Sequence, residues 1–196
     1  MINLSQTWSG PISKRVVIVH GWADDPTKGW IHWLAQELEA RDIKVQAPHF
    51  TEPRSPELKV WMDQLRSAIG QPDPGLVLVG HSLGCTMVLR AVSDWAPSVR
   101  IAGIVLVAGM VELKGWKPPA LFVPPLDYAK IQQIATKRIC IYSDDDERVK
   151  PELTKAMAKL LNAEEILDPG KGHFAGLHGC SELPSALQAV LSCYKN

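Results

Sequence analysis

The stretch that decides the fold is LVLVGHSLGCTMVLRAVSDW, residues 76–95. It opens with an unbroken aliphatic run at 76–79, which is typical of a strand buried on both faces of a sheet. Residues 83–95 are apolar almost all round, which predicts a helix packed deeply against that sheet. Gly80 and Gly84 lie at the junction and predict a sharp strand–turn–helix passage.

The same alternation of strands and helices extends in both directions from this stretch. Further strands are predicted at residues 15–19, 43–47, 101–108, 138–142 and 164–167, and further helices at 30–41, 56–69, 151–161 and 184–194. Such alternation favours a mostly parallel sheet covered on both faces, joined by right-handed crossovers. We therefore expect a single α/β domain over residues 1–196, with about six strands and about five helices.

Residues 110–128 interrupt the alternation with four prolines and three aromatic residues: Pro118, Pro119, Pro124, Pro125, Trp116, Phe122 and Tyr128. The segment leaves the carboxyl end of a strand, where open α/β sheets bind ligands, and long loops in compact domains are usually functional. We interpret it as a short lid with Trp116 and Phe122 in a pocket wall, and Trp22 is a third candidate. The alternative is a proline-stiffened crossover on the surface.

Composition excludes several classes of protein. The 21 basic and 21 acidic residues cancel, which argues against a nucleic-acid partner. The longest apolar run, 101–111, is far shorter than the roughly 20 residues that span a bilayer. Residues 1–14 lack the features of a signal peptide, so we expect a cytoplasmic protein with no membrane partner. In that compartment the four cysteines are expected to be free thiols.

Ser82 is the candidate nucleophile. It is the central residue of a G-x-S-x-G motif, where the turn lifts the hydroxyl clear of the sheet and the next helix directs its free N–H groups at it. The alternative is a serine that only caps the helix. A serine hydroxyl is a weak nucleophile and needs an adjacent base.

His173 is the candidate base, because it lies between the last strand and the last helix, at the same sheet edge as Ser82. His178 is its main rival. Four further histidines are given other roles: we expect His20 to be neutral and hydrogen-bonded near the site, His81 to point away from it, and His32 and His49 to be surface or structural residues.

The acidic run 143–147 follows the strand at 138–142 and supplies candidates for the carboxylate that orients the base. Asp146 is preferred because a turn must first carry the chain clear of the strand end, and Asp145 and then Asp144 are the alternatives. The chain order of serine, aspartate and histidine is that of the α/β-hydrolases.

Backbone N–H groups should complete this site as an oxyanion hole. One donor is expected from Leu83, directly after the nucleophile. The other is expected from the loop after the first strand, where we assign Trp22, with Ala23 as the competitor. His20 and Gly21 could otherwise form only a tight turn.

The sequence contains no motif that indicates a metal or cofactor site. The spacing of His173, His178 and Cys180 matches no usual zinc motif. No phosphate-binding or dinucleotide-binding glycine pattern is present. We expect neither a metal nor a cofactor.

Six segments together resemble the small α/β-hydrolases related to retinoblastoma-binding protein 9 and YdeN: VHGW at 19–22, GWIHWL at 29–34, GHSLGC at 80–85, PLDY at 125–128, SDDD at 143–146 and GHF at 172–174. The resemblance extends from about residue 15 to 194. It implies a compact serine hydrolase without the large cap of fuller α/β-hydrolases. It also implies that the last aspartate of the run, Asp146, is the acid. Glu147 and Arg148 follow here, where relatives often have proline.

These features predict a serine hydrolase that works through an acyl-enzyme on a small-molecule substrate. A carboxylesterase for small or short-acyl esters fits best, because 196 residues leave little room for a cap or a long acyl tunnel. An amidase, aminopeptidase-like or thioesterase activity on the same residues is one alternative. A protein that binds a partner and hydrolyses only incidentally is the other.

Overall fold

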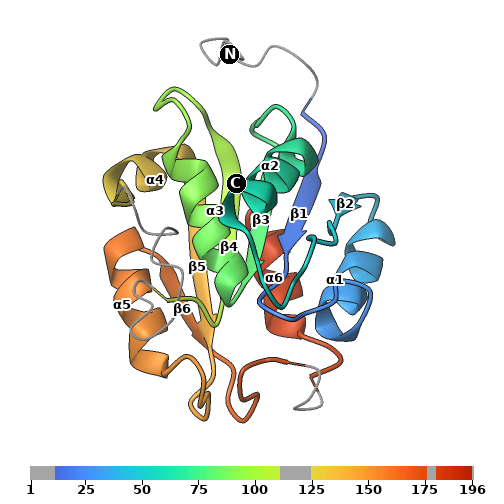
Figure 1. Cartoon of the computed structure of the whole chain (residues 1–196). Helices are drawn as coiled ribbons and strands as arrows, with labels where there is room; N and C mark the ends of the chain where they lie inside the picture. Colours follow the sequence, from blue (N-terminus) through green and yellow to red (C-terminus); the bar gives the residue numbers. More distant parts are fainter. Residues whose placement is uncertain (1–11, 111–124, 176–179, 196) are drawn as a thin grey trace.

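A six-stranded sheet runs through the middle of the molecule in the order β2-β1-β3-β4-β5-β6 (Figure 1). The computed structural model describes residues 12–110, 125–175 and 180–195. Every strand pairing in these ranges is parallel. The strands are β1 (Arg15–Val19), β2 (Lys44–Gln46), β3 (Leu76–His81), β4 (Ile101–Val107), β5 (Ala135–Tyr142) and β6 (Glu164–Leu167). The predicted α/β class is confirmed.

Helices cover both faces of the sheet. One face carries α1 (Gly29–Glu39) and α6 (Pro184–Ser192). The other carries α2 (Leu58–Ile69), α3 (Leu83–Ser93), α4 (Tyr128–Ile134) and α5 (Pro151–Leu161). Successive residues of the central strands face opposite sides of the sheet, and each side is an apolar core. Val77 belongs to one core and Leu78 to the other. This explains why these strands are continuous aliphatic runs.

The helix α4 was not predicted, so the described chain has one helix more than expected. Asp127 caps it by accepting a hydrogen bond from Lys130 N–H (3.0 Å), while Ile131 and Ile134 are buried. The strand β5 also begins earlier than predicted, at Ala135. The proposed lid falls largely on residues 111–124, which lie outside the described ranges together with Trp116 and Phe122.

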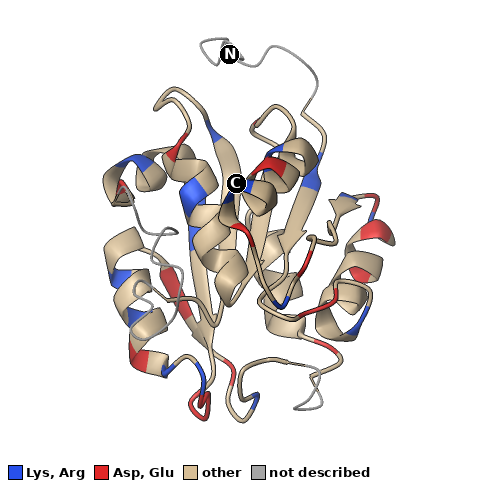
Figure 2. Cartoon of the chain, in the orientation of Figure 1, with Lys and Arg blue, Asp and Glu red and all other residues tan. Residues whose placement is uncertain are grey.

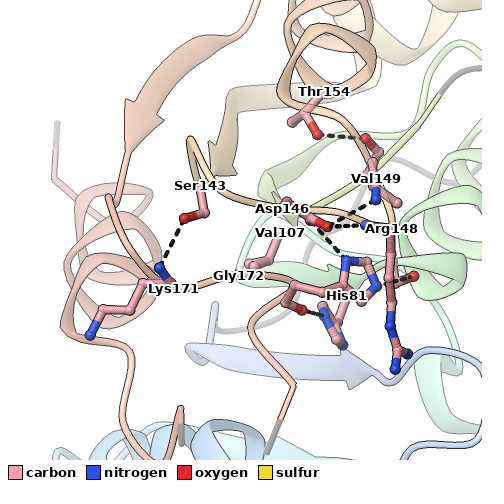
Figure 3. Close-up of polar contacts among 12 residues, drawn as sticks. His81, Val107, Ser143, Asp146, Arg148, Val149, Thr154, Lys171 and Gly172 are labelled. Carbon is pink, nitrogen blue, oxygen red and sulfur yellow. Dashed lines mark hydrogen bonds and ion pairs between the residues drawn. The ribbon is translucent and has the colours of Figure 1, made fainter. Parts of the chain in front are cut away.

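The helix α3 is buried along its whole length, as its composition predicts. One consequence concerns Thr86, whose hydroxyl is fully buried without a hydrogen-bond partner in the described part of the chain. On α5, by contrast, the equally buried Thr154 donates a hydrogen bond to Gly109 O at 2.7 Å (Figure 3). Thus α3 and α5 each bury a threonine hydroxyl, and within the described residues only the one on α5 has a hydrogen-bond partner.

An ion pair closes the amino-terminal edge of the sheet. Arg15 Nε donates to Asp73 Oδ2 at 2.6 Å, and the other carboxylate oxygen accepts Gly75 N–H at 2.8 Å.

Lys and Arg are mixed with Asp and Glu over the helices and loops (Figure 2). None of the helices within the described ranges is long and apolar enough to cross a membrane.

Candidate active site

The turn between β3 and α3 places Ser82 in a strained backbone conformation. Its φ and ψ are 52° and −117°, a region that L-residues rarely adopt, while its N–H donates to Val107 O of β4 at 2.9 Å. This is the sharp strand–turn–helix passage that the motif predicts. This turn places the serine side chain at the carboxyl edge of the sheet, between the end of β3 and the start of α3.

The two glycines of the motif are required by close approach of the backbone. A Cβ atom on Gly80 would lie 2.7 Å from Cys85 Cα, and one on Gly84 would lie 2.1 Å from Val19 O. Neither position accepts a side chain unless the backbone of α3 or β1 shifts. The pattern therefore sets how closely the helix after the serine packs on the sheet.

Three side chains from three loops meet at this edge. His173 Nε2 lies 3.0 Å from Ser82 Oγ, and His173 Nδ1 lies 2.8 Å from Asp146 Oδ2. The loops follow β3, β5 and β6, and the side chains of all three residues are buried or nearly so. The structure thus brings together the serine, histidine and aspartate that the sequence singled out.

The hydrogen bonds assign the protons within this group. Asp146 also accepts the N–H groups of Arg148 (2.8 Å) and Val149 (2.9 Å), as Figure 3 shows. A carboxylate so placed accepts from His173 Nδ1–H, which leaves Nε2 free to accept the serine proton. Burial lowers the pKa of His173, although the hydrogen bond to Asp146 opposes this. The imidazole is therefore neutral at neutral pH, as a base must be.

The other two aspartates of the acidic run hold the histidine loop by its backbone. Three consecutive N–H groups are bound from the β5 loop: Gly170 donates to Asp144 Oδ1 (3.0 Å), Lys171 to Ser143 Oγ (2.9 Å) and Gly172 to Asp145 Oδ1 (2.8 Å). Both alternatives to Asp146 thus bind the loop backbone, and Asp146 hydrogen-bonds the His173 ring. Spacing alone could rank the three aspartates but could not reveal this division of roles.

The loop after β1 lies directly against the serine. A Cβ atom on Gly21 would come within 3.1 Å of Ser82 Cβ. Ala23 N–H donates to Pro53 O at 2.8 Å, so the competing oxyanion donor is already engaged. Leu83 is the first residue of α3, where backbone N–H groups have no acceptor within the helix. Leu83 and Trp22 stay the predicted donors.

Known proteins resemble this chain in sequence and in fold. The sequence model of a family described as Serine hydrolase matches residues 16–192. The chain belongs to the serine hydrolase family.

Among its relatives, this serine hydrolase is 28% identical over 189 residues to the putative hydrolase YdeN of Bacillus subtilis, covering 93% of this chain and 97% of that protein. The crystal structure of that gene product superposes with a TM-score of 0.86 at 27% identity, covering 94% of this chain and 100% of the other. Est1E from Butyrivibrio proteoclasticus, solved with ferulic acid, matches with a TM-score of 0.67 at 17% identity over 94% of this chain and 89% of its own. At that identity the likeness shows the fold alone.

The remaining histidines of this serine hydrolase are His20, His32, His49, His81 and His178. His20 is neutral and structural, as expected: Phe50 N–H donates to its Nε2 (3.2 Å), its Nδ1–H donates to Gly21 O (2.8 Å), and burial lowers its pKa. His32 and His49 are exposed. His178, the rival base, lies outside the described residues.

The expectation that His81 points away from the site is wrong. Its ring centroid lies 5.2 Å from that of His173, and Nε2 lies 2.9 Å from the backbone O of His173. The alternation along β3 directs His81 toward the face covered by α1, where Trp30 packs on it, but the His173 loop turns back over the same face. Asp24, which lies 3.1 Å from His81 Nδ1, was also missed. Only its place in the loop after the first strand could have indicated it.

The cysteines of this serine hydrolase are all free thiols. Cys85, in the first turn of α3, is fully buried with Sγ 3.2 Å from Gly80 O, and burial raises its pKa well above the usual range. It is a packed thiol and not a second nucleophile. Within the described ranges, no group of three His, Cys, Asp or Glu side chains is placed to hold a metal ion.

Proposed function

We propose that this serine hydrolase is a carboxylesterase that cleaves small or short-acyl esters through an acyl-enzyme on Ser82. The observation that carries the proposal is the continuous hydrogen-bonded chain from Ser82 Oγ through His173 to Asp146, with contacts of 3.0 and 2.8 Å. A nucleophile, a base within hydrogen-bond reach and a group that orients the base are the arrangement that acyl transfer requires.

The reaction begins when Ser82 Oγ attacks the ester carbonyl carbon and His173 Nε2 takes the hydroxyl proton. The negative charge moves to the carbonyl oxygen, where the N–H groups of Leu83 and Trp22 stabilise it. When the C–O bond to the leaving group breaks, His173 returns the proton to the departing alkoxide. Asp146 stabilises the imidazolium between these two transfers.

The second half of the reaction repeats these transfers with water. His173 removes a proton from water as its oxygen attacks the acyl carbon bound to Ser82. When the intermediate collapses, the bond to Ser82 Oγ breaks, the carboxylic acid leaves and Ser82 recovers its proton from His173. The products are an alcohol and an acid, and the side chains return to their starting state.

Support for a short acyl group comes from the size of the chain, because 196 residues that include a six-stranded sheet and helices on both of its faces leave little room for a cap or a long acyl tunnel. The indole of Trp22, 39% exposed and hydrogen-bonded through Nε1 to Arg54 O at 2.9 Å, lies on the loop that contacts the serine. It is a fixed apolar surface against which a small acyl or alcohol group could pack. Trp116 and Phe122 remain proposed wall residues.

Covalent labelling by a fluorophosphonate probe tests the nucleophile. We expect the wild-type protein to be labelled at Ser82, and the Ser82→Ala variant to lose both labelling and ester hydrolysis, by about 10³-fold or more in kcat. Ser185→Ala is the matched control, because Ser185 donates to Asp168 at 2.6 Å without a histidine between them. Labelling that survives in Ser82→Ala, or a folded wild-type protein that is never labelled, would contradict the proposal.

A matched set of substrates tests the substrate class. We expect kcat/KM to fall from p-nitrophenyl acetate through butyrate to octanoate, and to be lower for the thioester and amide analogues. A flat or rising profile with acyl length would overturn the short-acyl assignment. A preference for the amide or the thioester would assign this site to the corresponding alternative class.

A further inference from the structure

His81 joins three segments of the site through a single buried ring. It is 3% exposed and directly precedes the serine. Its Nε2 lies 2.9 Å from the backbone O of His173 (Figure 3), and its Nδ1 lies 3.1 Å from Asp24 Oδ2. The Trp30 indole packs against the ring in a T-shaped arrangement, with 5.6 Å between the centroids. The ring is therefore fixed both by packing and by its two polar contacts.

Both partners of this ring accept hydrogen bonds. A backbone carbonyl accepts only, so Nε2 carries a proton and donates to it. Burial raises the pKa of Asp24, but the hydrogen bond and charge of His81 outweigh this and leave that pKa lowered, so Asp24 is a carboxylate. The ring meets both acceptors when Nε2 donates to His173 O and Nδ1 donates to Asp24, whose side chain is 31% exposed.

The contacts of the His173 loop show why this pair matters. Gly170, Gly172 and Phe174 all have left-handed backbone φ values, of 68°, 52° and 54°, so the loop is not held by a regular ladder. Its N–H groups at 170–172 are bound by side chains from the β5 loop. Among the hydrogen bonds of the described residues, the one from His81 ties the backbone of His173 to the strand that carries the serine.

We propose that His81 and Asp24 form a positioning pair that holds the His173 backbone at the distance from which its ring reaches Ser82. Because Asp24 lies in the loop that packs on the serine, the pair also links the base to the loop of the proposed oxyanion donor Trp22. The inference rests on the proposed function. A shift of about 1 Å in a reacting group can reduce catalysis by about 10²-fold, so such a restraint has a large kinetic effect.

The experiment compares the variants His81→Ala, His81→Gln and Asp24→Asn with wild type, using p-nitrophenyl acetate and the rate of fluorophosphonate labelling. We expect His81→Ala to lower kcat and the labelling rate by about 10- to 100-fold. The KM should change by no more than about 2-fold, because substrate binding is not altered. His81→Gln should recover part of the loss, since its amide can still donate to His173 O.

A double-mutant cycle tests whether the two residues act together. If Asp24 acts through His81, the variant carrying both Asp24→Asn and His81→Ala should be no slower than His81→Ala alone. Asp73→Asn is the matched structural control, because Asp73 also joins two segments through its carboxylate but lies at the opposite edge of the sheet. It should lower the thermal midpoint and leave kcat unchanged.

The outcomes separate this inference from the proposed function. A folded wild-type protein that neither reacts with the probe nor hydrolyses the ester overturns both. An active wild type with unchanged kcat in folded His81→Ala, or additive losses in the double variant, overturns the positioning pair alone. If His81→Ala does not fold, His81→Gln and Asp24→Asn decide, and wild-type kcat in both contradicts the inference.

Discussion

The imidazole of His173 lies among charges that act on it in opposite directions. Burial lowers its pKa most, the hydrogen bond and charge of Asp146 raise it, and the charges of His81 and Arg148 lower it. Arg148 is exposed, and its backbone N–H binds the same carboxylate that orients the imidazole. It therefore acts on the base by its charge, without a hydrogen bond to the ring.

This balance predicts the pH dependence of hydrolysis. Protonation of His173 removes the base, so kcat/KM should fall as pH drops through its pKa, with a midpoint below 6.5. Arg148→Gln removes a positive charge and should move the midpoint upward. The measurement is kcat/KM between about pH 4.5 and 8.

The control for this prediction is Arg66→Gln, because Arg66 lies on α2 and pairs with Asp63 and Asp94. It should leave the midpoint where it is. A midpoint above 6.5 in wild type, or a downward shift in Arg148→Gln, would be inconsistent with the electrostatics described for His173.

At the level of elements, α3 and α5 differ in how they bury a threonine. Removing a buried hydroxyl that has no partner relieves a desolvation penalty, whereas removing one that is bonded leaves its acceptor unsatisfied. Thr86→Val should therefore leave stability unchanged or raise it by up to about 1 kcal/mol, and Thr154→Val should lower it by about 1–3 kcal/mol. Urea denaturation of both variants measures the contrast. Equal losses would contradict it.

The elements also show how far the sequence could predict the fold. Continuous aliphatic runs such as 76–79 and 101–108 were unambiguous, because a strand buried on both faces must be apolar at every position. The seven-residue helix α4 was missed because its two buried isoleucines at 131 and 134 give too little periodicity after the proline-rich segment.

Within the site, the predictable residues were those fixed by backbone geometry. Gly80, Gly84 and Ser82 must occur together for the turn to form. Asp146 was preferred from the length of its loop and from the family resemblance, with Asp145 and Asp144 as alternatives. The contact of His81 with His173 depends on two loops that approach from distant parts of the chain. A side-chain alternation rule describes one strand and cannot indicate what another loop places over it.

At the scale of the whole molecule, two buried histidines couple stability to pH. Burial lowers the pKa values of His20 and His173 below the usual 6.5 in the folded protein. Below pH 6.5 the unfolded chain therefore binds more protons than the folded one, and the free energy of unfolding decreases as pH falls. Above that pH both states are neutral and these residues contribute no slope.

We therefore expect the urea midpoint to be lower at about pH 5.5 than at about pH 7.5. The variant His20→Gln should show a shallower pH dependence than wild type, because one of the two titrations is removed. A midpoint that is equal or higher at the lower pH would contradict this.

The separation of the site residues along the chain has a kinetic consequence. Ser82 and His173 lie 91 positions apart, and the strands β3 to β6 must all pair in register before the two side chains meet. Contacts between such distant positions form late when a chain refolds, because the loop between them must first be ordered. During refolding from urea, helical circular dichroism should thus recover before probe reactivity does. The reactivity of Ser82 toward the probe therefore reports when the last step of folding is complete.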